Sequence, residues 1–536
     1  MATKLHPLSK TKKFKSNFLS EDKSSIRPLL DKIYGLHSKL CDNGSKLAKR
    51  PIKRFKYEDE LSTDFFTNNG LSQKQLRNEL KQLFEGTINW QNPCTAFNIT
   101  STPLFDTVAA STIATLMNPN CLWDLTSGKF VLAEKKIIHL FGKKVFNSNI
   151  SDGFSTFGGK GTLLYAIKTG LSNCDLRHKK EGLDGKYVAI CSYASHFCIA
   201  DVCDYVGIGT NALLKIPLLP SGEMNYSILE EALEKSIKEG KKIATVICNG
   251  GTTIDFCMDN AKKIRSITDK LEKKYNLPYK IHIHGDMVFG WAWFFADEEY
   301  LKQSGTIAAK KILKIKTMLK NMKYTDSIGV DFHKMGLCPY NSSFFILKDK
   351  QKMNLLGGAV TALDNGLWGT KHPHYHSIEN SKSGAGIISA YSALCTLGSC
   401  GIADYLLYLM NVKETYITLI KDKFNHIFHI INSKSLGFEI VFTVSVNGHN
   451  FTKEDYLRLC NNIWYSTRSP YMISQVSRYF RNGKPEPAVL LYSMSPHTTD
   501  KHCLDVLKML EADCYNIAES EQHNGYKDNN NVFIPK

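Results

Sequence analysis

The sequence predicts an α/β protein with a mainly parallel, doubly wound sheet and a smaller α+β C-terminal domain. Between residues 150 and 345, short apolar runs rich in β-branched residues alternate with helical patterns. That alternation is typical of a sheet whose two faces are covered by helices. After about residue 385, two long helical patterns lead to two further strand candidates, which indicates a separate, smaller unit.

The elements follow in chain order. Residues 1–90 form a basic arm and a helical segment in which Ser72 is a candidate N-cap. We expect a large domain over residues 91–385, a small C-terminal domain over residues 386–520 and a polar tail over residues 521–536. The strands expected in the large domain are Tyr187–Ser192, Leu213–Pro217, Ile243–Cys248, Lys280–His284, Ser327–Asp331 and Phe344–Leu347. The small domain is expected to contain helices Gly386–Met410 and Val412–Ile431 and strands Phe438–Val444 and Val489–Tyr492.

Composition narrows the class of protein. The chain has 536 residues, 43% of them hydrophobic, so most of it should fold. No uninterrupted apolar run reaches the roughly 18 residues of a membrane-spanning helix, and the N-terminus has no secretory pattern. The 15 cysteines are scattered and odd in number, which favours free thiols in a reducing compartment. We therefore expect a cytoplasmic protein without a transmembrane segment.

The net charge of +17 is concentrated at the N-terminus. Residues 1–57 hold 15 Lys and Arg against 4 Asp and Glu, which is +11 and leaves only about +6 for the rest. Ten of the 68 basic residues are arginine. Because base readout relies on bidentate arginine contacts, we expect no specific nucleic-acid binding.

Two features lie at the start of a predicted helix or at the end of a predicted strand, where ligands of open α/β sheets collect. Gly158, Gly159 and Gly161 precede a helix that begins at about Thr162. Such a turn can hold an anion on backbone N–H groups, although a tight packing turn is an equally good interpretation. His196 follows the next strand, and by itself it fits a structural histidine at least as well as a functional one.

Two further features end later strands. His282, His284 and Asp286 alternate along one strand, but no additional ligand motif accompanies them, so we expect no metal. A carboxylate at a buried strand end, such as Asp286, needs a cationic partner. Lys334 also ends an apolar strand, where it could be a snorkelling lysine. It fits better as an amine with a depressed pKa that forms an imine with an aldehyde.

One ligand satisfies all four features. Pyridoxal 5'-phosphate has a phosphate for the glycines, a ring face to cover, a basic nitrogen for Asp286 and an aldehyde for Lys334. The four features together are more specific for this cofactor than any one of them is alone.

Over residues 90–400 the sequence resembles the group II pyridoxal-dependent decarboxylases, the family of glutamate and aromatic amino acid decarboxylases. The matching motifs are Gly158-Gly159, Ser195-His196, Gly251-Thr252-Thr253, Asp286 and His333-Lys334. The resemblance implies a fold-type-I protein similar to aspartate aminotransferase, with a seven-stranded sheet. It also implies a homodimer with shared active sites and an L-amino acid as substrate, converted to its amine and CO2 through a Lys334 Schiff base and a quinonoid intermediate.

The resemblance also assigns roles to residues. It implies that Lys334 and His196 are catalytic, with His196 stacking on the ring and Asp286 pairing with the pyridinium nitrogen. The remaining cofactor residues that it implies are Gly158, Gly159, Lys160 and His333 at the phosphate and Thr252 on the Asp286 side. The sequence departs from the family pattern at Lys160 and Lys382, where the family has a small residue and an arginine.

The remaining assignments rest on position. Residues 349–378 suggest a loop of the kind that carries a catalytic tyrosine in related decarboxylases, and Tyr375 is the candidate. Phe97 and Asn98 are candidate substrate contacts. Two alternatives stay open: a carbon–carbon lyase similar to sphingosine-phosphate lyase, and a catalytically degenerate dimer whose basic arm binds an acidic partner.

Overall fold

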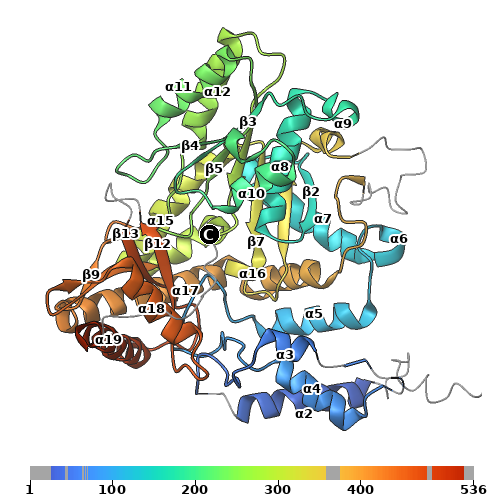
Figure 1. The fold of residues 1–536 in the computed structure, drawn as a ribbon. Helices are drawn as coiled ribbons and strands as arrows, with labels where there is room; N and C mark the ends of the chain where they lie inside the picture. The colour runs from blue at the N-terminus through green and yellow to red at the C-terminus, as the bar shows by residue number, and fades with distance from the viewer. Residues whose placement is uncertain are drawn as a thin grey trace, which may run out of the picture.

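The centre of the molecule is a seven-stranded sheet (Figure 1). The computed structural model describes residues 26–42, 46–62, 65, 66, 68, 70–357, 375–479 and 486–523. The strand order is β2-β8-β7-β6-β5-β3-β4, in which β8 runs antiparallel to both neighbours and the other neighbouring pairs are parallel. The strands are β2 (Asp152–Thr156), β3 (Tyr187–Ser192), β4 (Leu213–Ile216), β5 (Lys242–Asn249), β6 (His282–Asp286), β7 (Ser327–Asp331) and β8 (Ser343–Leu347). The predicted α/β class is confirmed, and β2 is the one strand of this sheet that the sequence did not indicate.

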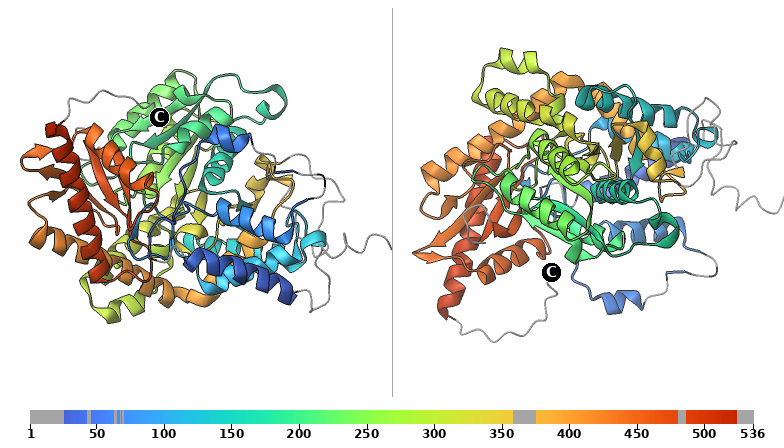
Figure 2. Two further views of the ribbon diagram at one scale, coloured as in Figure 1. Left: turned by 60° about the horizontal axis from the view of Figure 1, so that its bottom comes forward. Right: turned by 90° about the horizontal axis from the view of Figure 1, so that it is seen from above.

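Helices cover both faces of this sheet, as consecutive side chains of β3 show. Val188 and Ile190 pack in one core with α11 (Tyr226–Lys238) and α12 (Ala261–Lys274). Ala189 and Cys191 pack in a second core with α8 (Gly159–Cys174) and α10 (Cys198–Tyr205). Because side chains alternate between the faces of a strand, the two helix layers lie on opposite sides (Figure 2). The first layer also contains α13 (Trp291–Phe295) and α15 (Ile307–Leu319).

A second sheet of six strands forms the C-terminal part, in the order β1-β12-β13-β10-β11 with β9 beside β10. Its strands are β1 (Thr95–Ala96), β9 (Phe428–Ile430), β10 (Ile440–Val446), β11 (His449–Asn450), β12 (Met472–Tyr479) and β13 (Glu486–Leu491). It packs on α18 (Lys453–Trp464) and α19 (Asp500–His523) in a separate core. Strand β1 falls within residues 91–385, where we expected the large domain. It belongs instead to this C-terminal sheet, because Thr95 pairs in parallel with Met472.

Helix α17 (Ala385–Lys423) joins the two parts. The sequence predicted two helices with a break near residue 411; the structure also has two helical segments, but the break is a kink at Gly398, with φ 56°. Ala390 and Leu406 lie in the core of the large sheet, and Tyr416 lies in the core of the small one. By length and composition α17 could span a membrane, but here it contacts α5, α7 and α19.

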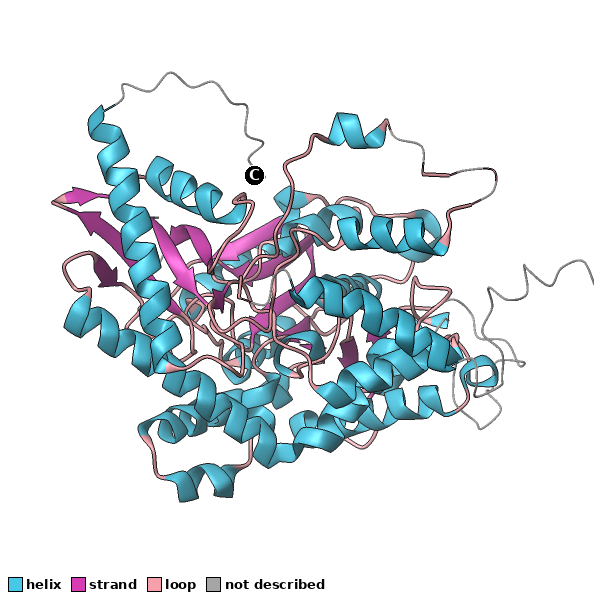
Figure 3. Cartoon of the chain, turned by 90° about the horizontal axis from the view of Figure 1, so that it is seen from below, coloured by secondary structure: helices cyan, strands magenta, loops and turns pink. Residues whose placement is uncertain are grey.

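The remaining helices surround the two sheets (Figure 3). Ser72 caps α4 through a capping box with Gln75, as the sequence suggested. The α-helices of this set are α2 (Ile26–Asp42), α3 (Tyr57–Leu61), α4 (Gln73–Leu83), α5 (Phe105–Met117), α6 (Asp124–Ser127), α7 (Lys129–Phe141), α9 (His178–Glu181), α14 (Glu298–Ser304) and α16 (Phe332–Met335). Short 3-10 or π turns are η3 (Gly142–Phe146), η4 (Thr210–Ala212), η5 (Lys320–Tyr324) and η6 (Lys350–Leu355).

Candidate active site

The carboxyl-terminal edge of the large sheet brings most predicted site residues together. Strands β2, β3, β5, β6 and β7 all end at this edge, because β2 and β7 both run antiparallel to β8. The residues at these strand ends or shortly after them are Gly158, Gly159, Lys160, His196, Thr252, Asp286, His333 and Lys334. A ligand at this edge would meet side chains from five strands.

Lys334 lies in the single turn of α16, one turn after the end of β7. Its Nζ is 2.9 Å from Oδ2 of Asp331, whose side chain is 1% exposed and whose Oδ1 accepts a hydrogen bond from the Ser343 hydroxyl at 2.6 Å. Burial alone would lower the pKa of Lys334, but the charge and hydrogen bond of Asp331 outweigh it, and the pKa is raised above that of an ordinary lysine. The expected depressed pKa is therefore wrong for this structure: the amine is protonated at neutral pH.

Asp286 ends β6 and is buried, as the sequence predicted. Burial raises the pKa of its carboxyl to about 6, while the charge of Lys334 and a 3.3 Å hydrogen bond from the Val288 amide act in the opposite direction. Among the described residues, no other donor reaches this carboxylate. A buried carboxylate with one donor can accept a further cationic partner.

His196 lies in the turn after β3. Its Nδ1 accepts a hydrogen bond from the Cys198 amide at 3.2 Å, and its ring stacks on Phe197 with centroids 4.4 Å apart. The ring surface is exposed, but the surrounding protein removes part of its hydration, which lowers its pKa, and the charge of Lys334 lowers it further. The imidazole is therefore neutral at physiological pH, which suits stacking against a flat ring.

The glycine turn brings the N-terminus of α8 close to Asp331. Gly158 has φ +136°, which favours glycine, and a Cβ on Gly159 would lie 2.9 Å from Asp331 Oδ2. The first amides of α8 have no partner inside the helix and can bind an anion. The side chain of Lys160 contacts other groups: its Nζ is 2.7 Å from Asp201 and 5.0 Å from the centroid of the Tyr205 ring. Its long side chain is held in that ion pair and so does not crowd the turn.

Thr252 stabilises the loop that follows β5. Its hydroxyl donates to the Ile254 carbonyl at 2.6 Å and accepts from the Cys257 amide at 2.8 Å. Next to it, the Gly250 amide donates to the Asp286 carbonyl at 2.8 Å. Thr252 therefore shapes the loop beside Asp286 by internal hydrogen bonds.

A chain of contacts connects Lys334 with the N-terminal segment. The His333 ring packs on Tyr340 at 4.4 Å between centroids, and the Tyr340 hydroxyl lies 3.0 Å from that of Thr100. Two residues before Thr100, the Asn98 amide donates to Ser474 at 2.8 Å. Phe97 stacks on Trp90 with centroids 6.1 Å apart and meets Trp464 edge to face. Phe97 and Asn98 thus reach the site region through Thr100, and their contact with substrate remains a prediction.

Tyr375 lies away from Lys334 within one protomer. Its carbonyl packs against Gly357, which follows η6 and the end of β8 opposite to the site. The neighbouring His372 and His374 fall outside the described residues, and His376 is buried. The catalytic role of Tyr375 stays a prediction that requires the loop to serve another active site.

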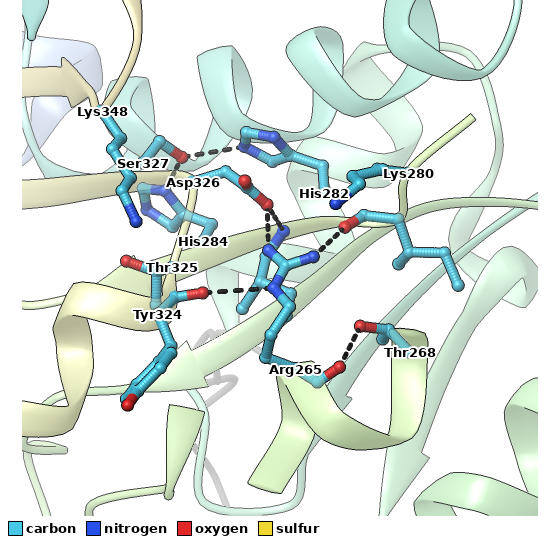
Figure 4. A network of polar contacts seen from close by, with 12 residues as sticks. Arg265, Thr268, Lys280, His282, His284, Tyr324, Thr325, Asp326, Ser327 and Lys348 are labelled. Carbon is cyan, nitrogen blue, oxygen red and sulfur yellow. Dashed lines mark hydrogen bonds and ion pairs between the residues drawn. The ribbon is translucent and has the colours of Figure 1, made fainter. Parts of the chain in front are cut away.

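His282 and His284 form a buried polar cluster (Figure 4). Nε2 of His282 and Nδ1 of His284 lie 2.9 and 2.8 Å from the Ser327 hydroxyl. Burial lowers the pKa of both rings, and Asp326 beside them pairs with Arg265. The alternation with Asp286 therefore reflects packing at the start of β6 and β7. In the described part of the chain, no group of three potential metal ligands is present.

Lys382 is the second residue at which the sequence departs from the family pattern. It contacts β2, the strand that precedes the glycine turn. Its side chain is 5% exposed and lies 3.7 Å from Glu134, which is fully buried. Both partners contact Ser155 of β2: Glu134 accepts from its amide at 2.7 Å, and Lys382 donates to its carbonyl. Glu134 is too far away in the sequence for any local pattern to pair it with Lys382.

We expect Lys382→Met to lower the free energy of unfolding by about 3–5 kcal/mol, because it leaves the Glu134 charge buried without a partner. Urea unfolding measures this change. The double variant Lys382→Met/Glu134→Leu should recover most of the loss, since it removes both charges. Equal stability of the two variants would contradict the pairing.

Comparison with known proteins identifies relatives of this arrangement. The model of the pyridoxal-dependent decarboxylase conserved domain matches residues 135–445. The chain is 24% identical over 360 residues to a tryptophan decarboxylase of Clostridium sporogenes, covering 63% of this chain and 78% of that protein. It is 22% identical over 312 residues to a glutamate decarboxylase-like protein of Gibberella zeae, covering 58% of this chain. The chain thus spans about half, 54%, of the length of that fungal relative.

Solved structures share the fold over nearly the whole chain. The glutamate decarboxylase domain of a Vibrio parahaemolyticus protein superimposes with a TM-score of 0.75 at 16% identity, covering 95% of this chain and all of that one. Oryza sativa TDC with PLP and tryptamine superimposes with a TM-score of 0.77 at 13% identity, covering 93% of this chain and 99% of that one.

Proposed function

Because the chain belongs to the pyridoxal-dependent decarboxylase family, we propose that it binds pyridoxal 5'-phosphate and removes the α-carboxylate of an L-amino acid as CO2 to leave the amine. The observation that carries the proposal is the meeting of Lys334, Asp286 and the N-terminus of α8 at one sheet edge. The named relatives support it: a tryptophan decarboxylase and a structure with PLP and tryptamine are among them.

The residues present fit this cofactor. The backbone amides at the start of α8, which begins at Gly159, are the candidate phosphate site. Asp286 is a buried carboxylate with one hydrogen-bond donor, which suits pairing with a cationic ring nitrogen, and neutral His196 offers a ring face. When bound, pyridoxal phosphate supplies a conjugated ring that accepts the electron pair left by the departing carboxylate.

The proton on Lys334 is controlled by Asp331. The amine must lose this proton before its nitrogen can act as a nucleophile, and the ion pair with Asp331 Oδ2, 2.9 Å away, opposes that loss because it raises the pKa of Lys334 and lowers the pKa of Asp331. Ser343 holds the other oxygen of the same carboxylate at 2.6 Å. Lys334 is thereby kept one turn from β7 and directed along the sheet edge.

Product analysis tests the proposal. Purified protein with pyridoxal phosphate should release CO2 and amine in equal amounts from at least one of the common L-amino acids. An aldehyde formed from a phosphorylated amino alcohol without CO2 would instead identify a carbon–carbon lyase. Absence of any visible cofactor band after addition of pyridoxal phosphate would overturn the proposal and favour a binding protein, whose polyanion affinity should then depend on residues 1–57.

Cofactor affinity should fall as the pH is lowered below about 6. The pKa of Asp286 is raised to about 6, so its carboxylate is charged above that pH and is lost as a partner for the ring nitrogen below it. Each unit of pH below 6 is expected to weaken binding by up to about tenfold. Fluorescence titration of the apoprotein between pH 5 and 8 measures this, and Asp286→Asn should flatten the dependence.

We propose that two copies associate through α5 and share the site. Phe105, Ile113 and Met117 of α5 are 86%, 58% and 70% exposed in a single protomer. The start of α5 contacts the segment after Lys334, because the Leu104 amide donates to the Leu337 carbonyl at 2.9 Å. A second copy on α5 would therefore border the site.

Ile113→Lys/Met117→Lys should shift the protein to monomers, because two charges would be buried at a surface that needs apolar contacts. Sedimentation velocity measures the change. Ile307→Lys is the matched control, since Ile307 is 72% exposed on α15, away from α5. A double variant that sediments as wild type does would contradict this interface.

We also propose a cytoplasmic location. The support is chemical: all 14 cysteines whose surroundings the structure describes are free thiols.

A further inference from the structure

Asn249 is the last residue of β5, and its side chain is the centre of a buried hydrogen-bond network beside the site. It is 2% exposed. Its Nδ2 donates to the Ser192 hydroxyl at 2.9 Å and to Asp259 Oδ2 at 2.8 Å, and its Oδ1 accepts from the Ser195 hydroxyl at 3.0 Å. Because a carboxylate such as Asp259 only accepts, the orientation of the amide is determined by its partners.

On one side this network fixes the turn that carries His196. The Ser195 hydroxyl, held by Asn249, also accepts from the Ser192 amide at 3.1 Å, and the Ser195 amide donates to the Ser192 carbonyl at 3.1 Å. The turn is thus closed on itself and tied to β5 through a single side chain. His196 is the next residue.

On the other side the network adjoins Asp286. Asn249 and Asp286 are partners in the β5–β6 register, and the amide that follows Asn249 donates to the Asp286 carbonyl at 2.8 Å. Asp259, buried behind them, accepts from the Asn249 amide at 2.8 Å and from the Met224 amide at 2.7 Å. The backbone of Asn249 is therefore held as firmly as its side chain.

We propose that Asn249 is a positioning residue that sets the His196 turn relative to the Asp286 strand end. One amide side chain bonds the turn through Ser195, while its own backbone is in register with Asp286. Loss of the amide releases the turn and leaves the strand ladder intact, so the two groups lose their mutual orientation. The inference rests on the proposed function, because it matters for catalysis only if both groups face one cofactor.

The first test uses the apoprotein and needs no cofactor. Diethyl pyrocarbonate modifies neutral, accessible imidazoles, and mass spectrometry of the peptide containing His196 gives its rate. Asn249→Ala should change this rate severalfold. Asn432→Ala is the matched control, because Asn432 is also 2% exposed and accepts from the Val441 amide at 2.8 Å, but in the C-terminal sheet. Equal His196 rates in wild type and both variants would overturn the proposal.

The second test uses the holoenzyme. Asn249→Ala should weaken pyridoxal phosphate binding about tenfold, the equivalent of one to two buried hydrogen bonds, and reduce the visible circular dichroism of the bound cofactor. Asn249→Ser retains a hydroxyl and should recover part of both, and it serves as the variant if Asn249→Ala does not fold. Asn432→Ala should lose stability only. If the wild type bound no cofactor, the proposed function would fail, and the His196 rate would still decide the role of Asn249.

Discussion

Lys334→Ala is expected to abolish decarboxylation, with kcat/KM lowered ~10⁴-fold or more, equivalent to ~5.5 kcal/mol of transition-state stabilisation. Lys334 is the amine placed at the end of β7 and held by Asp331 at 2.9 Å. Alanine removes both the nucleophile and the cationic partner of the buried Asp331. The measurement is CO2 release under single-turnover and steady-state conditions, with cofactor in excess.

Borohydride reduction is a second test of the role of Lys334. It should attach the cofactor covalently to the peptide that contains this residue. Lys413→Ala is a useful control, because Lys413 is 3% exposed and donates to the carbonyls of Ser435 and Gly437 in the C-terminal part. That variant should keep the label even where it loses stability. Labelling of a different lysine in the wild type would show that the amine has been misassigned.

Asp286→Asn is expected to lower kcat about 10²–10³-fold, as is typical when a group that stabilises developing charge is removed from a buried site. The substitution is nearly isosteric, so the end of β6 should keep its fold. The carboxylate charge disappears, and with it the partner that favours a protonated ring nitrogen. Steady-state kinetics with saturating cofactor separates this loss from weaker cofactor binding.

Asp201→Asn provides the comparison for Asp286. Asp201 is also close to the site, but it is 50% exposed and pairs with Lys160 at the surface. An exposed ion pair of this kind contributes little to the stability of the fold around it, so kcat should remain within about twofold of wild type. Comparable losses in the two variants would mean that general electrostatics, and not a specific contact with Asp286, governs the reaction.

The parts of this site that could be predicted from sequence are those whose signal is local. The apolar runs at β3 and β7 end four residues before His196 and three residues before Lys334, and their bounds agree with the structure. Strands β1 and β9 have two and three residues, too few for a period to show. The raised pKa of Lys334 was missed because it depends on one helical turn folding back onto Asp331, which a strand pattern does not indicate.

Long-range contacts set the other limit. Nothing near Lys382 suggests Glu134 as its partner, and nothing near Asn249 suggests that one amide joins Ser195 and Asp259. The sequence signal available for Asn249 was that a polar residue ends a buried, apolar strand. For Tyr375 the catalytic role was predicted from its position in the family pattern. Within one protomer, however, Tyr375 lies at Gly357 and away from Lys334.

Strand β1 has a consequence for how the chain folds. It joins the C-terminal sheet by pairing with β12, although the whole large sheet lies between them in sequence. During synthesis β1 emerges long before β12. The edge of β12 can therefore pair with β1 only if the N-terminal segment is still free when the last part of the chain emerges. Pairing over such a separation is slow, and an unpaired strand edge invites association with other chains. Fragments that begin after β1 should accordingly aggregate more readily than the full chain.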